Sequence, residues 1–387
     1  MELKSNPSYV CGETGQPLVY RTIGDTFDLA VERWGDREAI VVRHQDIRWT
    51  WRQLGEAIDA FARGLTGLDL QPGDRVGIWS PNNIEWIIAQ FATAKAGLVL
   101  VNINPACRKA ELVHTLEKVG CKALLFAAKF KSSDYVKMLH DIAPGIPNGL
   151  PGKLELPELP ELRTLVVIGD SAEPGMYRFD EIQSLAPPNA FEELQRRAQT
   201  LQPDDPINIQ FTSGTTGLPK GATLSHFNIL NNAIFVARAM NFTEQDRLCI
   251  PIPLYHCFGM VLSVLACVSH GATMVFPNEA FDAESTLQAV SEEKCTALHG
   301  VPTMFIAELE HPRFAEFDLQ HLRTGIMAGA PCPIEVMRKV ISDMNMKQVT
   351  IAYGMTETSP VSFQSATLSL IHISEPTRLL VQSRMPS

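Results

Sequence analysis

The fold of this chain is limited most by an alternation of short apolar runs with amphipathic segments, which begins near Glu38 and begins again near Pro206. Runs rich in Val, Ile and Leu predict buried strands, and apolar residues spaced by three or four predict the helices between them. Strands that alternate with helices favour a largely parallel sheet, because each helix returns the chain to the same end of the sheet. The expected elements are 38–42, 51–68, 75–79, 83–96, 98–101, 109–119 and 123–126, then 207–210, 225–240, 272–276, 284–293, 323–327, 333–342 and 348–352.

The two series predict an α/β fold, with two stacked α/β subdomains, largely parallel sheets and a small β-rich part. We expect one large domain over 20–366, with a first lobe at about 38–170 and a second at about 203–366. The length of 387 residues agrees with two or three packed subdomains rather than one ordinary core. Open α/β sheets bind ligands beyond the carboxyl ends of their strands, so functional loops are expected there.

Composition argues against several classes of protein. The net charge is −10 and Lys and Arg form no cluster, so no nucleic-acid partner is expected. The eight cysteines form no C-x-x-C pair and have no zinc-like spacing, which predicts reduced packing residues in a cytoplasmic protein. No apolar run is long enough for an integral membrane span, and the N-terminus resembles no secretory or organelle signal.

The segment 211–221 has the composition of a phosphate site, with three glycines, four hydroxyl side chains and one lysine. Glycines let backbone N–H groups converge on an anion, hydroxyls add donors, and the lysine adds a positive charge. Pro219 directly precedes Lys220, so the segment is not the G-x-x-x-x-G-K-[ST] loop of P-loop proteins. The candidate phosphate ligands are Thr212, Ser213, Gly214, Thr215, Thr216, Gly217 and Lys220.

This residue order resembles the signature of the ATP-dependent adenylate-forming (AMP-binding) superfamily, which reads roughly [ST]-S-G-[ST]-[ST]-G-x-P-K-G. The resemblance covers nearly all of 20–366 and implies the large N-terminal domain of the adenylate-forming fold. It also implies that the segment 211–221 holds the β- and γ-phosphates of ATP. Four runs make the chain most similar to medium-chain or broad fatty acyl-CoA synthetases, namely 205–214, 254–259, 300–305 and 352–357.

Two further segments follow predicted strands. The small residues at 328–332 let a planar ring approach the backbone, although alone they are also typical of an ordinary turn. In the family the matching segment lines the adenine, and the resemblance gives that role to Gly329, Ala330 and Pro331. The segment 353–358 would contact the nucleotide through Tyr353, Gly354, Met355 and Thr356, with the tyrosine ring stacked on the base.

Thr356 and Glu357 belong to the same segment and carry different chemistry. Thr356 can donate to the α-phosphate, and Glu357 can hold Mg²⁺, a hard cation that prefers oxygen ligands. Taken alone, Glu357 fits a solvated surface carboxylate better than a metal ligand. Its place after the glycine-rich segment, in the order that the family has, favours the metal role.

His256, in the run Leu254-Tyr-His-Cys-Phe-Gly259, resembles the family position beside the carboxylate of the acid. An imidazole N–H there is available to carboxylate or phosphate oxygens. A histidine among aromatic residues also fits a core residue with satisfied hydrogen bonds. The apolar pocket for the acid has candidate lining residues that could equally be core, namely Phe258, Met260, Val301, Pro302, Met304 and Phe305.

The resemblance implies an enzyme that activates a carboxylic acid, of the medium-chain fatty acid class, with ATP and Mg²⁺ and then transfers the acyl group to CoA. Its catalytic residues would be Lys220, His256, Thr356 and Glu357. Two alternatives stay open: an adenylating enzyme that loads a carrier-protein thiol, and a nucleotide-binding fragment without catalysis. An oligomer is possible, and the sequence does not specify one.

The segment 368–387 breaks the pattern. It resembles a translated sequencing adaptor, in which two constant blocks flank four variable residues, although a short native strand is the other interpretation. We therefore expect a non-native tail. The resemblance then places the ribose-binding aspartate, the hinge arginine and the mobile C-terminal domain with its catalytic lysine outside this chain. We expect such a fragment to bind ATP weakly and to form acyl-adenylate poorly.

Overall fold

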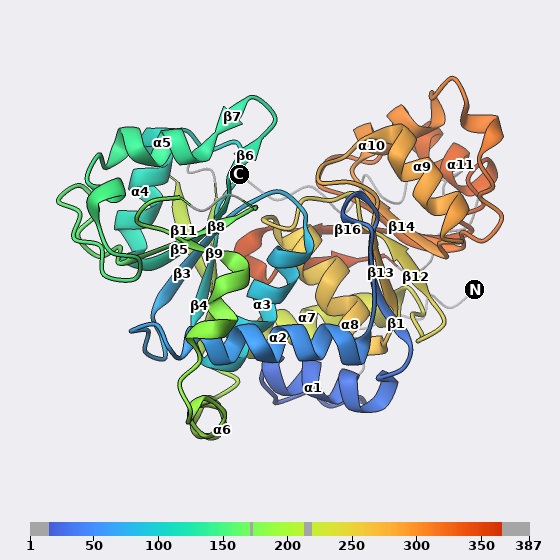
Figure 1. Cartoon of the computed structure of the whole chain (residues 1–387). Helices are drawn as coiled ribbons and strands as arrows, with labels where there is room; N and C mark the ends of the chain where they lie inside the picture. The colour runs from blue at the N-terminus through green and yellow to red at the C-terminus, as the bar shows by residue number, and fades with distance from the viewer. Residues whose placement is uncertain (1–14, 171–172, 213–218, 366–387) are drawn as a thin grey trace, which may run out of the picture.

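The computed structural model describes residues 15–170, 173–212 and 219–365. Within these ranges the strands form two large sheets (Figure 1) and a two-stranded ribbon made of β6 (Lys129–Phe130) and β7 (Ser133–Asp134). The described pairs of the two large sheets are parallel except at sheet edges, where β2, β11 and β17 run antiparallel to their neighbours. This arrangement confirms the expected α/β fold with largely parallel sheets.

The eight-stranded sheet has the order β17-β16-β15-β14-β12-β13-β1-β2. Its strands are β17 (Val361–Gln364), β16 (Gln348–Gly354), β15 (Thr324–Ala328), β14 (Ala297–Gly300), β12 (Arg247–Cys249), β13 (Thr273–Phe276), β1 (Glu38–Val42) and β2 (Ile47–Thr50). The seven-stranded sheet has the order β11-β10-β4-β3-β5-β8-β9. Its strands are β11 (Lys220–Ser225), β10 (Pro206–Thr212), β4 (Val99–Asn102), β3 (Arg75–Trp79), β5 (Cys121–Ala127), β8 (Thr164–Ile168) and β9 (Tyr177–Arg178).

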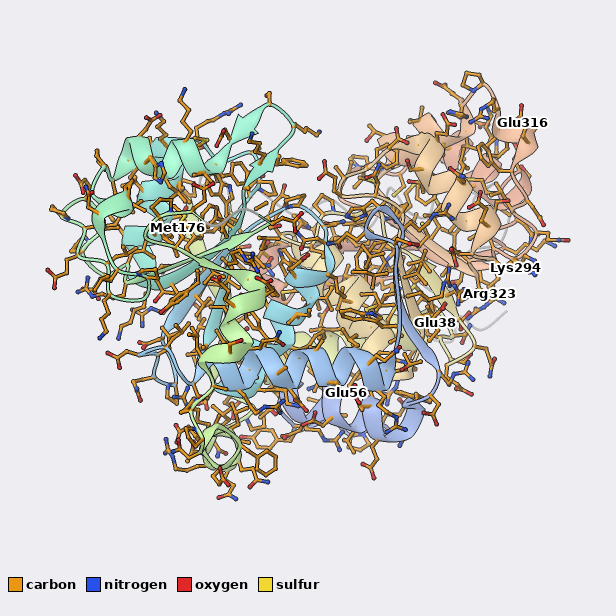
Figure 2. All side chains as sticks on the ribbon, in the orientation of Figure 1. Glu38, Glu56, Met176, Lys294, Glu316 and Arg323 are labelled. Atoms are coloured by element: carbon orange, nitrogen blue, oxygen red, sulfur yellow. The ribbon has the colours of Figure 1, made fainter. Side chains whose placement is uncertain are left out.

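The sheets do not follow the chain order of the two expected lobes. Strand β1 belongs to the eight-stranded sheet, where Ile40 lies opposite Met274 of β13, and β10 belongs to the seven-stranded sheet beside β4. Figure 2 accordingly shows Glu38, from β1, in the same lobe as Arg323, which directly precedes β15. The local sequence of β1 predicts a buried strand, but only the packing of distant segments decides which sheet it joins.

Helices form three layers around the two sheets (Figure 1). Between the sheets lie α1 (Ile23–Trp34), α2 (Trp51–Leu65), α3 (Ile84–Ala96), α7 (His226–Ala239) and α8 (Ala266–His270), with α6 (Ala190–Thr200) packed against α2 and α3. The outer face of the seven-stranded sheet carries α4 (Lys109–Val119) and α5 (Tyr135–Ile142). The outer face of the other sheet carries α9 (Ala283–Glu292), α10 (Pro302–Leu309) and α11 (Ile334–Ser342). No helix in the described ranges is both long and apolar enough to cross a membrane.

Capping side chains fix where several helices begin. Thr50 accepts a hydrogen bond from the backbone N–H of Gln53, and the Gln53 side chain accepts one from Thr50, which forms a capping box at α2. Asn83 caps α3 through one bond, in which its side-chain oxygen accepts from the N–H of Trp86. Ser225 caps α7 through the N–H of Asn228, as the sequence predicted.

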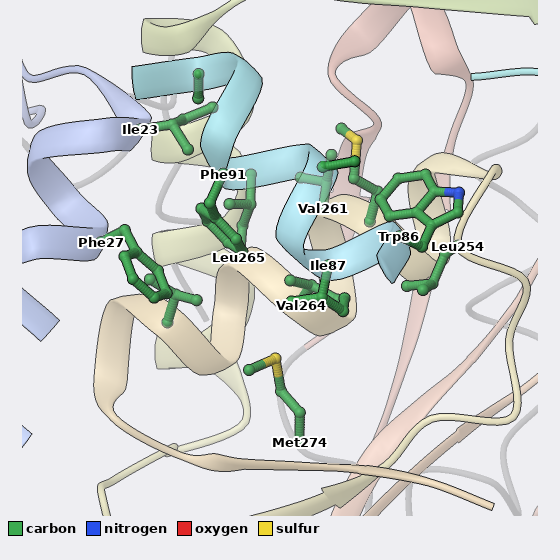
Figure 3. Packing of buried hydrophobic residues seen from close by; sticks show 14 of the residues in the cluster. Ile23, Phe27, Trp86, Ile87, Phe91, Leu254, Val261, Val264, Leu265 and Met274 are labelled. Carbon is green, nitrogen blue, oxygen red and sulfur yellow. The ribbon is translucent and has the colours of Figure 1, made fainter. Parts of the chain in front are cut away.

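The largest core lies between the sheets and joins α1, α3 and the π-helix η4 (Phe258–Leu265), as Figure 3 shows. The rings of Phe27 and Phe91 lie 4.6 Å apart between their centroids. Val261 and Val264 of the π-helix approach α3 in the same core. This helical layer contacts both sheets. It therefore fixes the distance between the strand ends of one sheet and those of the other, where the functional loops are expected.

A buried amide in this layer gives a first prediction. Gln90 of α3 is 5% exposed, and neither polar atom of its side chain has a hydrogen-bond partner among the described residues. Burial of an unpaired amide costs free energy, so Gln90→Leu is expected to raise the free energy of unfolding by about 1–2 kcal/mol. Urea denaturation of the two proteins measures this change. A loss of stability in Gln90→Leu would contradict the prediction.

A buried histidine gives a second prediction, on pH. The Nδ1 atom of His226 accepts a hydrogen bond of 3.0 Å from the N–H of Ile23, and burial lowers the pKa of His226 to about 4. In the unfolded chain His226 takes up a proton near pH 6.5, whereas in the folded chain it does so only near pH 4. Between these two pH values protonation favours the unfolded state, so the free energy of unfolding decreases as the pH is lowered. Lowering the pH from 7 to 5 is expected to cost about 2 kcal/mol through His226 alone. Urea denaturation at both pH values measures the change. In His226→Gln the contribution of His226 to this pH dependence should be absent.

Candidate active site

A pocket of about 560 Å³ opens at the carboxyl ends of β10, β15 and β16, opposite the loop that leads into η4. It lies between the two sheets, because β10 belongs to the seven-stranded sheet and the other two strands to the eight-stranded sheet. Thr212 and Glu357, 145 residues apart in sequence, meet here. The pocket is lined by nine residues that the sequence singled out: Thr212, His256, Phe258, Gly329, Tyr353, Gly354, Met355, Thr356 and Glu357.

Of the other residues predicted to contact the nucleotide, three are described by the structure and are not among the lining residues of this pocket. Lys220 is exposed at the start of β11, opposite Thr212 in the antiparallel pair of β10 and β11. Ala330 and Pro331 are exposed in the turn after β15 and do not line this pocket, because the chain turns outward after Gly329. The remaining phosphate candidates lie outside the described residues: Ser213, Gly214, Thr215, Thr216 and Gly217.

Strand β11 was missed by sequence reasoning, which expected a helix to follow the glycine-rich segment. The segment instead connects two antiparallel strands, and α7 begins only after β11. The sequence of β11, Lys-Gly-Ala-Thr-Leu-Ser, has weak strand propensity, and its backbone pairs with β10 at the edge of the sheet. This hairpin brings Lys220 back to the level of Thr212.

A carboxylate and a hydroxyl face each other at the phosphate side of the pocket. Thr212 Oγ1 donates a hydrogen bond of 3.2 Å to Glu357 Oε1, and Glu357 is exposed. Among the described residues no group of three or more His, Cys, Asp or Glu side chains could hold a metal ion by itself. Mg²⁺ often binds through one or two carboxylates, with substrate phosphates and water as its other ligands, so an accessible Glu357 with a neighbouring hydroxyl fits this cation.

The hydrogen bonds of His256 define which ring nitrogen carries the proton. The backbone N–H of Phe258 donates to Nδ1 of His256 over 3.1 Å, so Nδ1 is the acceptor and Nε2 carries the hydrogen. The surrounding protein lowers the pKa of His256 below its ordinary value. The ring is therefore neutral near pH 7 and presents an Nε2–H donor to the pocket.

Cys257 connects the histidine loop to the loop after β16. Its Sγ atom lies 3.7 Å from Thr356 Oγ1 and 3.6 Å from His256 Nδ1. Burial raises the pKa of the Cys257 thiol to about 11, so the thiol stays protonated. The residue acts as a small buried contact between two loops rather than as a nucleophile.

Two glycines shape the wall of the pocket where the sequence predicts that the base binds. Gly329 has a φ of 84°, a conformation that other residues rarely adopt, and it ends β15 at the pocket wall. A Cβ atom on Gly354 would lie 1.9 Å from the carbonyl oxygen of Pro360, so only glycine fits there. The ring of Tyr353 is 68% exposed beside them and is free to stack on a planar ligand.

The apolar wall of the pocket differs from the predicted set. Phe258 lines it together with Leu262 of η4, which the sequence did not single out. The other candidates are not among its lining residues and pack in the cores, fully or partly buried: Met260, Val301, Pro302, Met304 and Phe305. A run of apolar residues contains no signal that separates a pocket wall from a core, since both exclude water.

Three buried amides near the pocket were also missed. Asn102, Asn208 and Gln210 lie on β4 and β10, in strands whose residues are mostly buried. A signal was present, because Asn is rare in strands and buried polar groups need partners. The alternation of apolar and amide residues in Ile207-Asn-Ile-Gln210 marks one face of β10 as polar although it is buried.

Comparison with known proteins agrees with this fold. Residues 27–380 match the model of the AMP-binding enzyme family, and the chain belongs to that family. It is 46% identical over 348 residues to the YngI protein of Bacillus subtilis (strain 168), covering 90% of this chain and 63% of that protein. It is 44% identical over 358 residues to a medium-chain acyl-CoA ligase, ACSF2, of Danio rerio, covering 92% of this chain and 59% of that protein.

Solved structures share the fold at lower identity. An anthranilate CoA ligase, AuaEII, in complex with anthranoyl-AMP superposes with a TM-score of 0.76 at 23% identity, over 90% of this chain and 62% of that one. A long-chain-fatty-acid-CoA ligase (FadD1) from Archaeoglobus fulgidus gives a TM-score of 0.76 at 20% identity, over 95% of this chain and 70% of that one. The chain spans about three fifths of the length of the curated relatives it matches.

Proposed function

We propose that this protein activates a carboxylic acid with ATP and transfers the acyl group to CoA. The observation that carries the proposal is the convergence of Thr212, His256 and Glu357 in one pocket whose other wall is apolar. Phosphates, a carboxylate and an alkyl chain each meet a suitable surface there. Identity of 44% to a medium-chain acyl-CoA ligase supports a medium-chain fatty acid as the substrate class.

The proposed first step forms an acyl-adenylate. A carboxylate oxygen of the acid attacks the α-phosphorus of ATP, and pyrophosphate leaves with the bonding electrons. The Nε2–H of His256 donates to the acid and holds its carboxylate in line. Thr356 donates to an α-phosphate oxygen, and Lys220 supplies positive charge to the phosphates. Mg²⁺, when bound through Glu357, neutralises negative charge on the phosphates.

The proposed second step uses CoA. Its thiolate attacks the acyl carbon of the adenylate, a thioester bond forms, and AMP leaves with the electrons of the broken acyl–phosphate bond. The apolar wall made by Phe258 and Leu262 keeps the alkyl chain in place between the two steps.

Mass spectrometry tests the proposal. The chain is incubated with ATP, Mg²⁺ and octanoic acid in stoichiometric amounts, then with CoA or with a carrier protein that bears phosphopantetheine. We expect octanoyl-adenylate with pyrophosphate, formed slowly, and octanoyl-CoA as the second product. Acyl transfer to the carrier protein alone would favour a carrier-loading enzyme. Bound nucleotide without any acid-dependent pyrophosphate would favour a binding protein without catalysis.

A further inference from the structure

A chain of buried amide side chains runs from β10 to the loop that carries His256. Gln210 Nε2 donates to Asn208 Oδ1 over 2.9 Å, and Asn208 Nδ2 donates to Asn102 Oδ1 over 2.9 Å. Asn102 Nδ2 then donates to the backbone carbonyl of Tyr255, the residue before His256, over 3.1 Å. The chain crosses from the strand that ends at Thr212 to the loop on the opposite side of the pocket.

The orientation of these amides is fixed at both ends. Asn208 Nδ2 also donates to the carbonyl of Leu100 over 2.9 Å, so its Oδ1 must face Gln210. Asn102 gives its N–H to a backbone carbonyl, so its Oδ1 must accept. All three side chains are at most 3% exposed. Such a network stabilises one arrangement strongly, because each unpaired member would cost its full desolvation penalty.

The loop before His256 has one further side-chain anchor, at a different place. Asn82 accepts from the N–H of Leu254 over 2.8 Å and donates to the carbonyl of Ile252 over 3.0 Å. Asn82 therefore holds the start of the loop to the segment between β3 and α3. Of these two anchors, the contact from Asn102 at Tyr255 is the one adjacent to His256 in sequence, and it leads back to β10 through Asn208.

We propose that Asn102 and Asn208 are positioning residues that set His256 relative to the phosphate-binding end of β10. The inference rests on the proposed role of His256 at the carboxylate of the acid. Attack on the α-phosphorus requires the acid and the phosphates to be in line. The two proposed holders belong to different sheets, because Thr212 ends β10 of the seven-stranded sheet and His256 follows β12 of the eight-stranded sheet. The chain of amides connects the end of β10 directly to the His256 loop. Its loss should therefore weaken the binding of a ligand that joins acid and nucleotide more than the binding of the nucleotide alone.

The test compares two ligands in four variants. Octanoyl sulfamoyl adenosine, a stable analogue of the acyl-adenylate, occupies both halves of the site, whereas AMP occupies the nucleotide half. The variants are Asn102→Leu, Asn208→Leu, the double variant, and Gln90→Leu as a control that removes a buried amide away from the pocket. If Asn102→Leu does not fold, Asn102→Ser replaces it in the same test, because the serine hydroxyl is too short to make the hydrogen bonds of the amide.

We expect calorimetry to show about tenfold weaker binding of the analogue to each single variant, with AMP affinity and Gln90→Leu unchanged. The double variant should lose no more than a single one, since both substitutions break one network. The ¹⁵N signals of the His256 ring provide a readout that needs no ligand. They should show the Nε2–H tautomer in the wild-type chain and a mixture in Asn102→Leu, because the Phe258 contact loosens.

The outcomes separate this inference from the proposed function. Failure of the wild-type chain to bind the analogue would count against the proposed function of acid activation. The ¹⁵N signals of His256 would still show whether Asn102 positions the imidazole. A folded Asn102→Leu or Asn102→Ser with unchanged His256 signals overturns the inference. An equal loss of affinity for AMP and for the analogue would also overturn the inference, because it would show that the amides support the pocket as a whole.

Discussion

Glu357→Gln is expected to abolish the effect of Mg²⁺ on ATP binding, with a loss in affinity of roughly 100-fold at saturating Mg²⁺. Glu357 is the accessible carboxylate of the pocket and lies 3.2 Å from the Thr212 hydroxyl. The amide keeps the shape of the side chain but lacks the charge that a hard cation requires. Calorimetric titration with ATP, with and without Mg²⁺, measures the change in each protein.

Glu335→Gln is the matched control. Glu335 is exposed on α11, pairs with Arg338 one turn away and is not among the lining residues, so the same change of charge occurs outside the pocket. ATP affinity and its Mg²⁺ dependence should stay at the wild-type values in this variant. An equal response to Mg²⁺ in Glu357→Gln and in the wild-type chain would show that another group holds the cation.

Arg323→Met is expected to lower the free energy of unfolding by about 3–5 kcal/mol. The Arg323 guanidinium donates to both carboxylate oxygens of Asp246, over 3.0 and 2.6 Å, and to the carbonyls of Met240 and Asn241. The side chain of Asp246 is only 3% exposed. Methionine fills a similar volume but leaves this buried carboxylate without its cation, and stability falls for that reason.

Urea denaturation of three variants separates the charge pair from the loss of packing. Arg338→Met removes an exposed arginine with one surface partner, so it should change stability by less than about 1 kcal/mol. Asp246→Asn together with Arg323→Met removes both charges and should recover part of the loss. A change below about 1 kcal/mol in Arg323→Met alone would mean that Asp246 is satisfied by its other donors, Thr243 and Thr296.

Local chemistry made much of the fold predictable. The strand at 75–79 and the helix at 109–119 lie where the sequence predicted them, and Ser225 caps α7 as expected. Apolar periodicity and a capping hydroxyl act within a few residues, so they can be read from one segment. Sheet membership cannot be read in this way, because the partner of β1 is β13, more than two hundred residues later, and the packing of distant segments decides that pairing.

The site was predictable where a residue type has one dominant chemistry. The approach of the Pro360 carbonyl requires glycine at position 354, and Glu357, which the sequence suggested for a hard cation, lines the pocket. Leu262 and Asn102 were not found, because their roles depend on a π-helix and on contacts between two sheets. Met260 and Phe305 show why the sequence left two possibilities open, since their apolar character fits a pocket wall and a core equally well, and the fold buries them in cores.

Titration with octanoyl sulfamoyl adenosine tests the central claim most directly, because this molecule needs the nucleotide half and the acid half of one pocket at the same time. We predict one site per chain and an affinity at least about 100-fold higher than that for AMP or for octanoate alone. Binding no tighter than that of AMP would contradict the claim that Thr212, His256 and Glu357 form a single site for acid activation.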